Sequence, residues 1–152
     1  MCLIIDANIA SLVFSAEPHE DFQPIWDALQ NGRAVAVHGG HLTVEYARLT
    51  RIRRLLLELG RRGALRKVED GPVDLATADF AEQEIRSDDS HILGLARVSR
   101  VRLLCSHDQD LHADFTNPAL LRPRGSVYQT SDHSPLISRH CRPKKQSWRR
   151  SR

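Results

Sequence analysis

The chain has 152 residues, of which 41 % are hydrophobic and 27 % charged, a composition typical of one soluble globular domain. It excludes a collagen-like or disordered chain, and no stretch approaches the roughly 18 apolar residues of a membrane span. The net charge of +3 is uneven: residues 139–152 hold seven of the 22 Lys and Arg and none of the 19 acids, which leaves residues 1–138 with 15 basic and 19 acidic side chains, or −4.

Short apolar runs predict buried β-strands at residues 2–5, 34–37 and 101–105, each followed by a polar break. A further run at 126–128 predicts a last strand after a turn. Helical spacing of apolar residues alternates with these runs and predicts helices at 21–30, 41–59, 75–85, 90–99 and 133–140.

This alternation predicts an α/β domain in which helices cover both faces of a central parallel sheet, as in a three-layer α/β/α arrangement. We expect the domain to occupy residues 1–141. Residues 142–152 contain no core-forming pattern and are expected to form a basic, disordered tail.

The three cysteines, Cys2, Cys105 and Cys141, are odd in number, far apart and without CxxC spacing. They indicate neither a disulfide framework nor a zinc site, and a reducing compartment fits them best. The N-terminal residues also lack the charged segment and long apolar stretch of a secretory signal, so we expect a cytoplasmic protein.

Acidic residues follow two of the predicted strands. In open α/β sheets, ligands bind beyond the carboxyl ends of the strands. Asp6 directly follows the first run, and Asp108 lies three residues beyond the third. Either residue alone is better explained as a turn or helix-capping residue, but the pair together favours a shared site at one edge of the sheet.

Two further acids stand out by position. Glu45 interrupts the apolar stripe of the predicted 41–59 helix, where reaching out to solvent or pairing with Arg48 explains it as well as a functional role does. Asp89, or its neighbour Asp88, precedes the predicted helix at 90–99, and helix capping is again the simpler explanation.

If the elements fold as predicted, four acids converge at one edge of the sheet: Asp6, Glu45, Asp89 and Asp108. Two unit charges about 4 Å apart repel by ~4 kcal/mol at an effective dielectric constant of 20, so a cation must join them. Oxygen ligands without His or Cys suit Mg²⁺ or Mn²⁺, which activate water for attack on a phosphodiester. The sequence therefore predicts metal-dependent phosphodiester hydrolysis.

Several motifs in order resemble those of the PIN-domain nucleases, particularly the small prokaryotic kind that includes the VapC-like toxins. They are LIIDAN at 3–8, LTVEYARL at 42–49, DSHILGLARVSRVRLLCSHDQDL at 89–111, HADF at 112–115 and RGSVY at 124–128. The resemblance implies a PIN-like fold, an Mg²⁺- or Mn²⁺-dependent ribonuclease (a hydrolase) acting as an endoribonuclease on RNA, and frequent homodimers. It also implies, for a toxin, a cognate antitoxin as partner.

The resemblance assigns the metal-binding and catalytic roles to Asp6, Glu45, Asp89 and Asp108. It gives Asn8 and Ser106 supporting roles, and Asp110 either assists the acids or caps the next short helix. His107 departs from the family pattern, which more often has Asn there.

Basic side chains accumulate between residues 48 and 67, with one acid among them. A solvated helix face explains such a run as well as binding of RNA phosphates does, and for the latter role we single out Arg48, Arg51 and Arg54. The alternative to the nuclease is a catalytically inert nucleic-acid-binding or regulatory module of the same fold. A structural α/β protein without nucleic-acid affinity is a third interpretation.

Overall fold

The computed structural model describes residues 1–141, so the tail predicted at 142–152 lies outside the described residues. The strands are β1 (Ile4–Ile5), β2 (Ala36–His38), β3 (Leu65–Lys67), β4 (Leu103–Cys105) and β5 (Ser126–Tyr128). The α-helices are α1 (Ala10–Val13), α2 (Gln23–Gln30), α3 (His41–Ala47), α4 (Arg53–Arg61), α5 (Asp70–Ala81), α6 (Ser90–Ser99), α7 (Gln109–Phe115) and α8 (Pro135–His140). Four short 3₁₀ helices accompany them: η1 (Ala7–Ile9), η2 (Glu20–Phe22), η3 (Thr50–Ile52) and η4 (Ser131–His133).

All five strands within residues 1–141 are parallel. One ladder has the order β1-β4-β5, and the other pairs β2 with β3. A parallel bridge between Leu3 and Ala36 joins the two ladders, supported by the hydrogen bond from Val37 N to Leu3 O at 2.9 Å. The strand order is therefore β3-β2-β1-β4-β5, and it reverses direction between β1 and β4. In open α/β sheets, ligands bind at such a reversal, outside the carboxyl ends of the strands.

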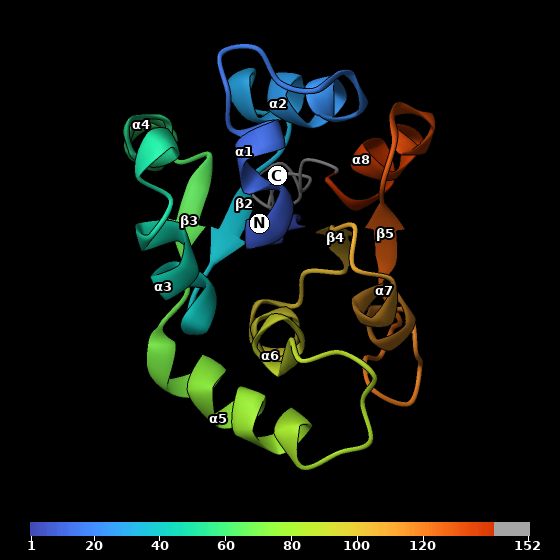
Figure 1. Cartoon of the computed structure of the whole chain (residues 1–152). Coiled ribbons are helices and arrows are strands. Elements are labelled where there is room, and N and C mark those ends of the chain that lie inside the picture. The colour runs from blue at the N-terminus through green and yellow to red at the C-terminus, as the bar shows by residue number, and fades with distance from the viewer. Residues whose placement is uncertain (142–152) are drawn as a thin grey trace, which may run out of the picture.

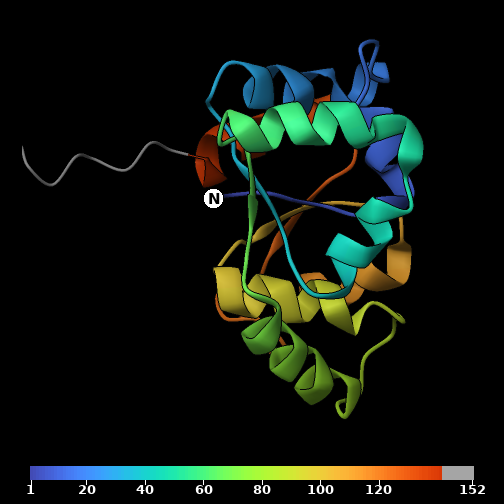
Figure 2. The ribbon, with the colours of Figure 1, turned by 90° about the vertical axis from the view of Figure 1, so that its left-hand side faces the viewer.

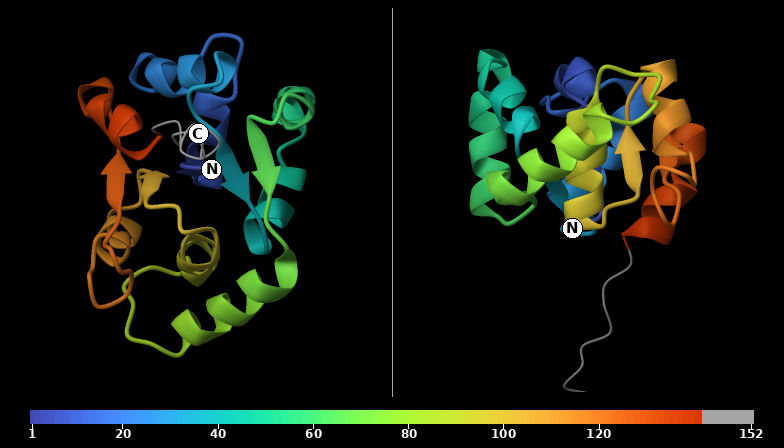
Figure 3. Two further views of the ribbon diagram at one scale, coloured as in Figure 1. Left: turned by 180° about the vertical axis from the view of Figure 1, so that it is seen from behind. Right: turned by 90° about the horizontal axis from the view of Figure 1, so that it is seen from below.

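Helices lie on both sides of the strands. Figure 1 shows α2, α4 and α8 on one side and α5, α6 and α7 on the other, and the rotated view in Figure 2 agrees. The right-hand view of Figure 3, from below, shows the second group from outside. The α/β class predicted from the sequence is confirmed, and this arrangement is compatible with three layers.

The buried strands and α6 form the centre of the core. β1 and β4 are fully buried, and every residue of α6 from His91 to Ala96 is buried. Helix α6 packs closely on α5: a Cβ added at Gly94 would lie 2.4 Å from Thr77 Oγ1. Only glycine fits where α6 crosses α5. This close packing fixes the position of α6, and therefore of its first residues next to Asp89.

The predicted helix at 41–59 is wrong as a single element. The chain leaves the helix at Leu49, whose φ is −90° and ψ is 73°, and continues as η3 and then α4. The break lets Leu42 and Tyr46 of α3 and Leu59 of α4 enter the core from different directions. The apolar spacing alone does not reveal the change of direction.

Other boundaries also differ from the sequence prediction. Strand β3 was not predicted, because Leu65 is its one buried residue and Arg66 and Lys67 are exposed. Helix α5 begins at Asp70 and ends at Ala81, ahead of the predicted range 75–85. The predictions at 90–99 and 126–128 coincide with α6 and β5.

The cysteine prediction needs a correction. Cys2 and Cys141 form a disulfide with a Cα–Cα distance of 5.2 Å, and Cys105 is a buried free thiol. The two ends of residues 1–141 meet across 139 residues of sequence, a proximity that cysteine spacing cannot show. The pairing disagrees with the expected reducing compartment, because disulfides persist mainly in oxidising ones. Within residues 1–141, no helix is long and apolar enough to cross a membrane.

Candidate functional site

Asp6 lies where the strand order reverses. It directly follows β1, and its backbone N–H donates to Cys105 O of the neighbouring β4 at 2.9 Å. Its side chain is buried, with 4 % of the residue exposed, and accepts a hydrogen bond from Ser106 Oγ at 2.8 Å. The end of β4 thus holds the carboxylate at the end of β1.

Asp108 is the second acid at this edge. Its backbone N–H donates to Ser106 Oγ at 3.1 Å, so Ser106 links Asp108 to Asp6. Its side chain caps α7, since Oδ1 accepts from Asp110 N at 3.0 Å and Leu111 N at 3.2 Å. The capping explanation therefore holds for Asp108, and capping also fixes where its carboxylate lies.

Asp89 is the third acid, and capping does not explain it. It occupies the position before α6, but its side chain makes no capping hydrogen bond. Burial raises its pKa to about 7, together with the negative charge of Asp6, a side-chain hydrogen bond with Asp108 and the charges of Asp108 and Glu45. Its neighbour Asp88 is exposed. Of the doublet, Asp89 is the residue that meets the other acids.

Glu45 completes the group from α3. Its Oε1 lies 2.7 Å from His91 Nε2 of α6, so its partner is His91, and the proposed pairing with Arg48 is wrong. Burial lowers the pKa of His91, an effect opposed by the charge and hydrogen bond of Glu45. The contact ties α3 to α6 beside the carboxyl ends of the strands.

Local sequence explains how α3 reaches this position. Gly40, which precedes α3, has a positive φ of 55°, and an added Cβ would lie 2.8 Å from Val73 Cγ1. Its N–H donates to Asp70 Oδ1 at 2.9 Å, which holds the turn against the start of α5. Farther along, Tyr46 donates its hydroxyl to Ile5 O at 2.5 Å, next to Asp6. Both ends of α3 are therefore anchored.

The four carboxylates form a negative group. Burial also raises the pKa of Asp6, and the charge of Glu45 adds to the effect, while hydrogen bonds from Ser106 and the Asn8 backbone and the charge of His91 oppose it. Within residues 1–141, no Lys or Arg forms an ion pair with any of the four carboxylates, and the charged group paired with one of them is His91, with Glu45. Neighbouring carboxylates without a basic partner favour a cation.

The donor chemistry fits Mg²⁺ or Mn²⁺, but the side chains do not form a ready-made cage. Within residues 1–141, no group of three or more His, Cys, Asp or Glu side chains is placed to hold one metal ion. Mg²⁺ usually binds to one or two carboxylates and keeps several waters, so three preset ligands are not required. Asp6 and Asp108, joined by Ser106, are the pair fixed most firmly by hydrogen bonds.

The predicted supporting residues take different places. Ser106 contacts both Asp6 and Asp108, as described. Asn8 is exposed and reaches Asp6 through its backbone, and Asp110 is exposed in the first turn of α7. His91 was not singled out from the sequence, although its position two residues after Asp89 was a usable signal.

The arginines divide into two groups along α4. Figure 2 shows the turn from α3 to α4 on the side of the molecule where β1 ends and α7 begins, whereas α4 runs away from it. Arg48, Arg51 and Arg54 are exposed and lie in or beside this turn. Arg62, just past the far end of α4, donates to the side chain of Gln30 at 2.8 Å. Arg48, Arg51 and Arg54 are therefore placed on the side of the molecule where β1 ends.

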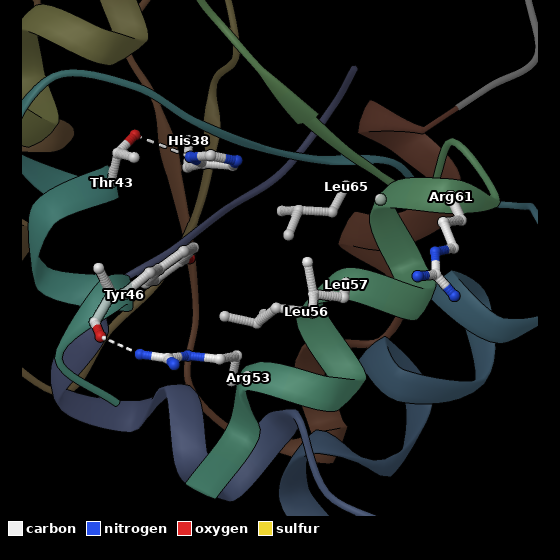
Figure 4. Close-up of a pocket in the computed structure, with 10 residues that line it drawn as sticks. His38, Thr43, Tyr46, Arg53, Leu56, Leu57, Arg61 and Leu65 are labelled. Atoms are coloured by element: carbon white, nitrogen blue, oxygen red, sulfur yellow. Dashed lines mark hydrogen bonds between the residues drawn. The ribbon is translucent and has the colours of Figure 1, made fainter. Parts of the chain in front are cut away.

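A separate cavity of about 510 Å³ lies between α3 and α4. Figure 4 shows Leu56, Leu57 and Leu65 on one wall and Tyr46 opposite, with Arg53 and Arg61 at the rim. Its walls are mainly apolar, and none of the four acids lines it. Tyr46 thus connects two features: its ring lines the cavity, and its hydroxyl supports the strand that ends at Asp6.

Comparison of the chain with protein-family models, with curated proteins and with solved structures gives no match.

Proposed function

We propose that the protein is a metal-dependent ribonuclease of the PIN type that hydrolyses RNA phosphodiester bonds. One observation carries the proposal. At the edge where the strand order reverses, Ser106 links Asp6 to Asp108, Asp89 shares a hydrogen bond with Asp108, and the charge of Glu45 acts on Asp6 and Asp89. Neither the fold nor helix capping requires Asp89 and Glu45 to lie beside Asp6. Holding like charges close together is unfavourable, so their proximity is best explained by a function that needs them.

The proposal gives each residue of the site a separate role. Asp6 and Asp108 are the main metal ligands, held in register by Ser106, while Asp89 and Glu45 complete the negative group. Once bound, Mg²⁺ or Mn²⁺ would lower the pKa of a water molecule and offset the charge of the attacked phosphate. His91 keeps the Glu45 carboxylate oriented toward the site.

RNA is the proposed substrate. Arg48, Arg51 and Arg54 are exposed on the side of the molecule that holds the acids, where they would bind phosphates on either side of the cleaved bond. The choice of RNA over DNA comes from the PIN resemblance. A toxin role, with a cognate antitoxin and a homodimer, is a narrower form of the same proposal. It includes a cytoplasmic location, where the Cys2–Cys141 pair would be reduced.

Cleavage of a mixed RNA pool with Mg²⁺, with Mn²⁺ and with EDTA tests the proposal. We expect products with either metal, none with EDTA, and none from Asp6→Asn. Asp88→Asn is the matched control, because this carboxylate is exposed and beside the site, and it should cleave like the wild type. Cleavage that persists in EDTA, or equal loss in both variants, would refute the proposal.

The second candidate is an inert nucleic-acid-binding module. It is favoured by the lack of a preset group of three metal-holding side chains within residues 1–141. It predicts RNA binding that weakens steeply with salt, is unchanged in Asp6→Asn, and is never followed by product.

A further inference from the structure

A carboxylate outside the acid group holds the segment that leads to Asp89. Asp114 lies in the last turn of α7 and is buried, with 2 % of the residue exposed. Its Oδ1 accepts from Arg86 N at 2.9 Å, and its Oδ2 accepts from Ser87 N at 2.9 Å and Ser87 Oγ at 2.7 Å. Several donors aimed at one carboxylate compensate its burial and form strong, directional bonds.

The hydrogen bonds continue to Asp89. Ser87 Oγ, which donates to Asp114, also accepts from Asp89 N at 3.3 Å. Residues 82–89 lie between α5 and α6 and form neither helix nor strand, so regular backbone hydrogen bonds do not set their course. Figure 1 shows this segment passing α7 on its way to the start of α6. Ile85 packs against the core, and the contacts with Asp114 hold Arg86 and Ser87, the residues that lead to Asp89.

Helix α7 therefore contacts the segments that carry two of the four acids, Asp89 and Asp108. Asp108 caps its first turn, and Asp114, in its last turn, holds the residues just before Asp89. Because a helix is a rigid spacer of about 1.5 Å per residue, the two attachments fix Asp89 relative to Asp108.

We propose that Asp114 is a positioning residue that, through Ser87, sets the distance between the Asp89 and Asp108 carboxylates. The inference rests on the proposed function, since it assigns Asp114 a role in shaping that metal site. A purely structural role, in which Asp114 only stabilises the fold, is the competing explanation. The two differ in what they predict for a variant that stays folded.

The test compares Asp114→Ala and Asp114→Asn with Phe115→Leu, which removes core packing from the adjacent, fully buried position of α7. Mn²⁺ binding is measured by electron paramagnetic resonance well below the unfolding temperature of every variant. Partners of metal-ligating side chains typically contribute 10- to 100-fold in metal affinity. We expect a loss of about tenfold or more in Asp114→Ala. Asp114→Asn, which keeps an acceptor oxygen, should lose less, and Phe115→Leu should bind like the wild type.

A second readout does not depend on metal. The ¹³Cγ resonance of Asp89 in EDTA reports its surroundings, and amide exchange reports the order of residues 86–89. Both should change in Asp114→Ala and stay unchanged in Phe115→Leu. If the wild type binds no Mn²⁺, the proposed function fails, while the Asp89 resonance still decides the positioning role. An unchanged resonance in Asp114→Ala, or an equal change in Phe115→Leu, would overturn it.

Discussion

Replacing Asp89 with asparagine should stabilise the metal-free protein at pH 8 while abolishing RNA cleavage. In the folded chain the pKa of Asp89 is raised to about 7 from the usual 3.8, because the side chain is buried and meets Asp6, Asp108 and Glu45. The folded state therefore binds this proton more tightly than the unfolded chain does. In the metal-free protein, the contribution of Asp89 to the free energy of unfolding is therefore greatest below about pH 4 and is lost as the pH rises to 7.

The size of the effect follows from the pKa difference. Without any correction for solvent, the raised pKa of Asp89 lowers the free energy of unfolding by about 4 kcal/mol at pH 8, at about 1.36 kcal/mol per pKa unit. Asp89 is partly solvent-exposed, so we expect screening to leave about 2 kcal/mol. For a chain of this length that corresponds to a rise of about 4 to 8 °C in Tm. The asparagine side-chain NH₂ can also donate to the Asp108 carboxylate, whereas Asp89 donates only when it is protonated.

Thermal unfolding in EDTA at pH 4.5 and pH 8 measures the effect. The Asp89→Asn protein should exceed the wild type in Tm at pH 8 by more than at pH 4.5, and Asp88→Asn should show no such difference. Mg²⁺ should raise the Tm of the wild type at pH 8 more than that of Asp89→Asn, because the ion relieves the same repulsion. A destabilised Asp89→Asn protein at pH 8, or a gain independent of pH, would refute the reasoning.

Three further changes have definite expected outcomes. Replacing Arg51 and Arg54 with glutamine should raise KM for RNA. It should also reduce the slope of the logarithm of the RNA-binding constant against the logarithm of the salt concentration by about 1.4. Arg61→Gln, at the far end of α4, should change neither quantity, and equal effects would contradict this placement. Cys141→Ser should lower the free energy of unfolding by roughly 2 to 5 kcal/mol, because the disulfide closes a long loop, and denaturant titration with and without a reductant checks it. Gly94→Ala should destabilise the domain by about 2 kcal/mol, since its Cβ meets α5, and an unchanged denaturation midpoint would count against that packing.

Much of the fold follows from local patterns in the sequence. The runs ending before Asp6 and Ser106 are apolar because β1 and β4 are buried on both faces, and such strands are recognisable without tertiary information. Strand β3 escapes the same criterion because it lies at the edge of the sheet with two exposed basic residues. The break at Leu49 depends on where α3 and α4 pack, which apolar spacing does not encode.

The site divides in the same way. Asp6 and Asp108 were predictable because parallel strands bring their carboxyl ends to one edge. The motif DSHI favours Asp89 over Asp88 in the sequence, and the structure separates the two by burial and by the contact of Asp89 with Asp108. His91 and Asp114 act through contacts across 46 and 27 or 28 residues of sequence. The position of His91 two residues after Asp89 is a local signal, but its contact with Glu45 is not, and neither is the contact of Asp114 with Arg86 and Ser87.

The most direct measurement is the anomalous difference map of crystals grown with MnCl₂. A peak in contact with carboxylate oxygens of Asp6 and Asp108 is the expected result, with Asp89 no longer hydrogen-bonded to Asp108. A well-ordered site without such a peak at millimolar Mn²⁺, or a peak only elsewhere on the surface, would contradict the idea that these carboxylates gather to bind a divalent ion.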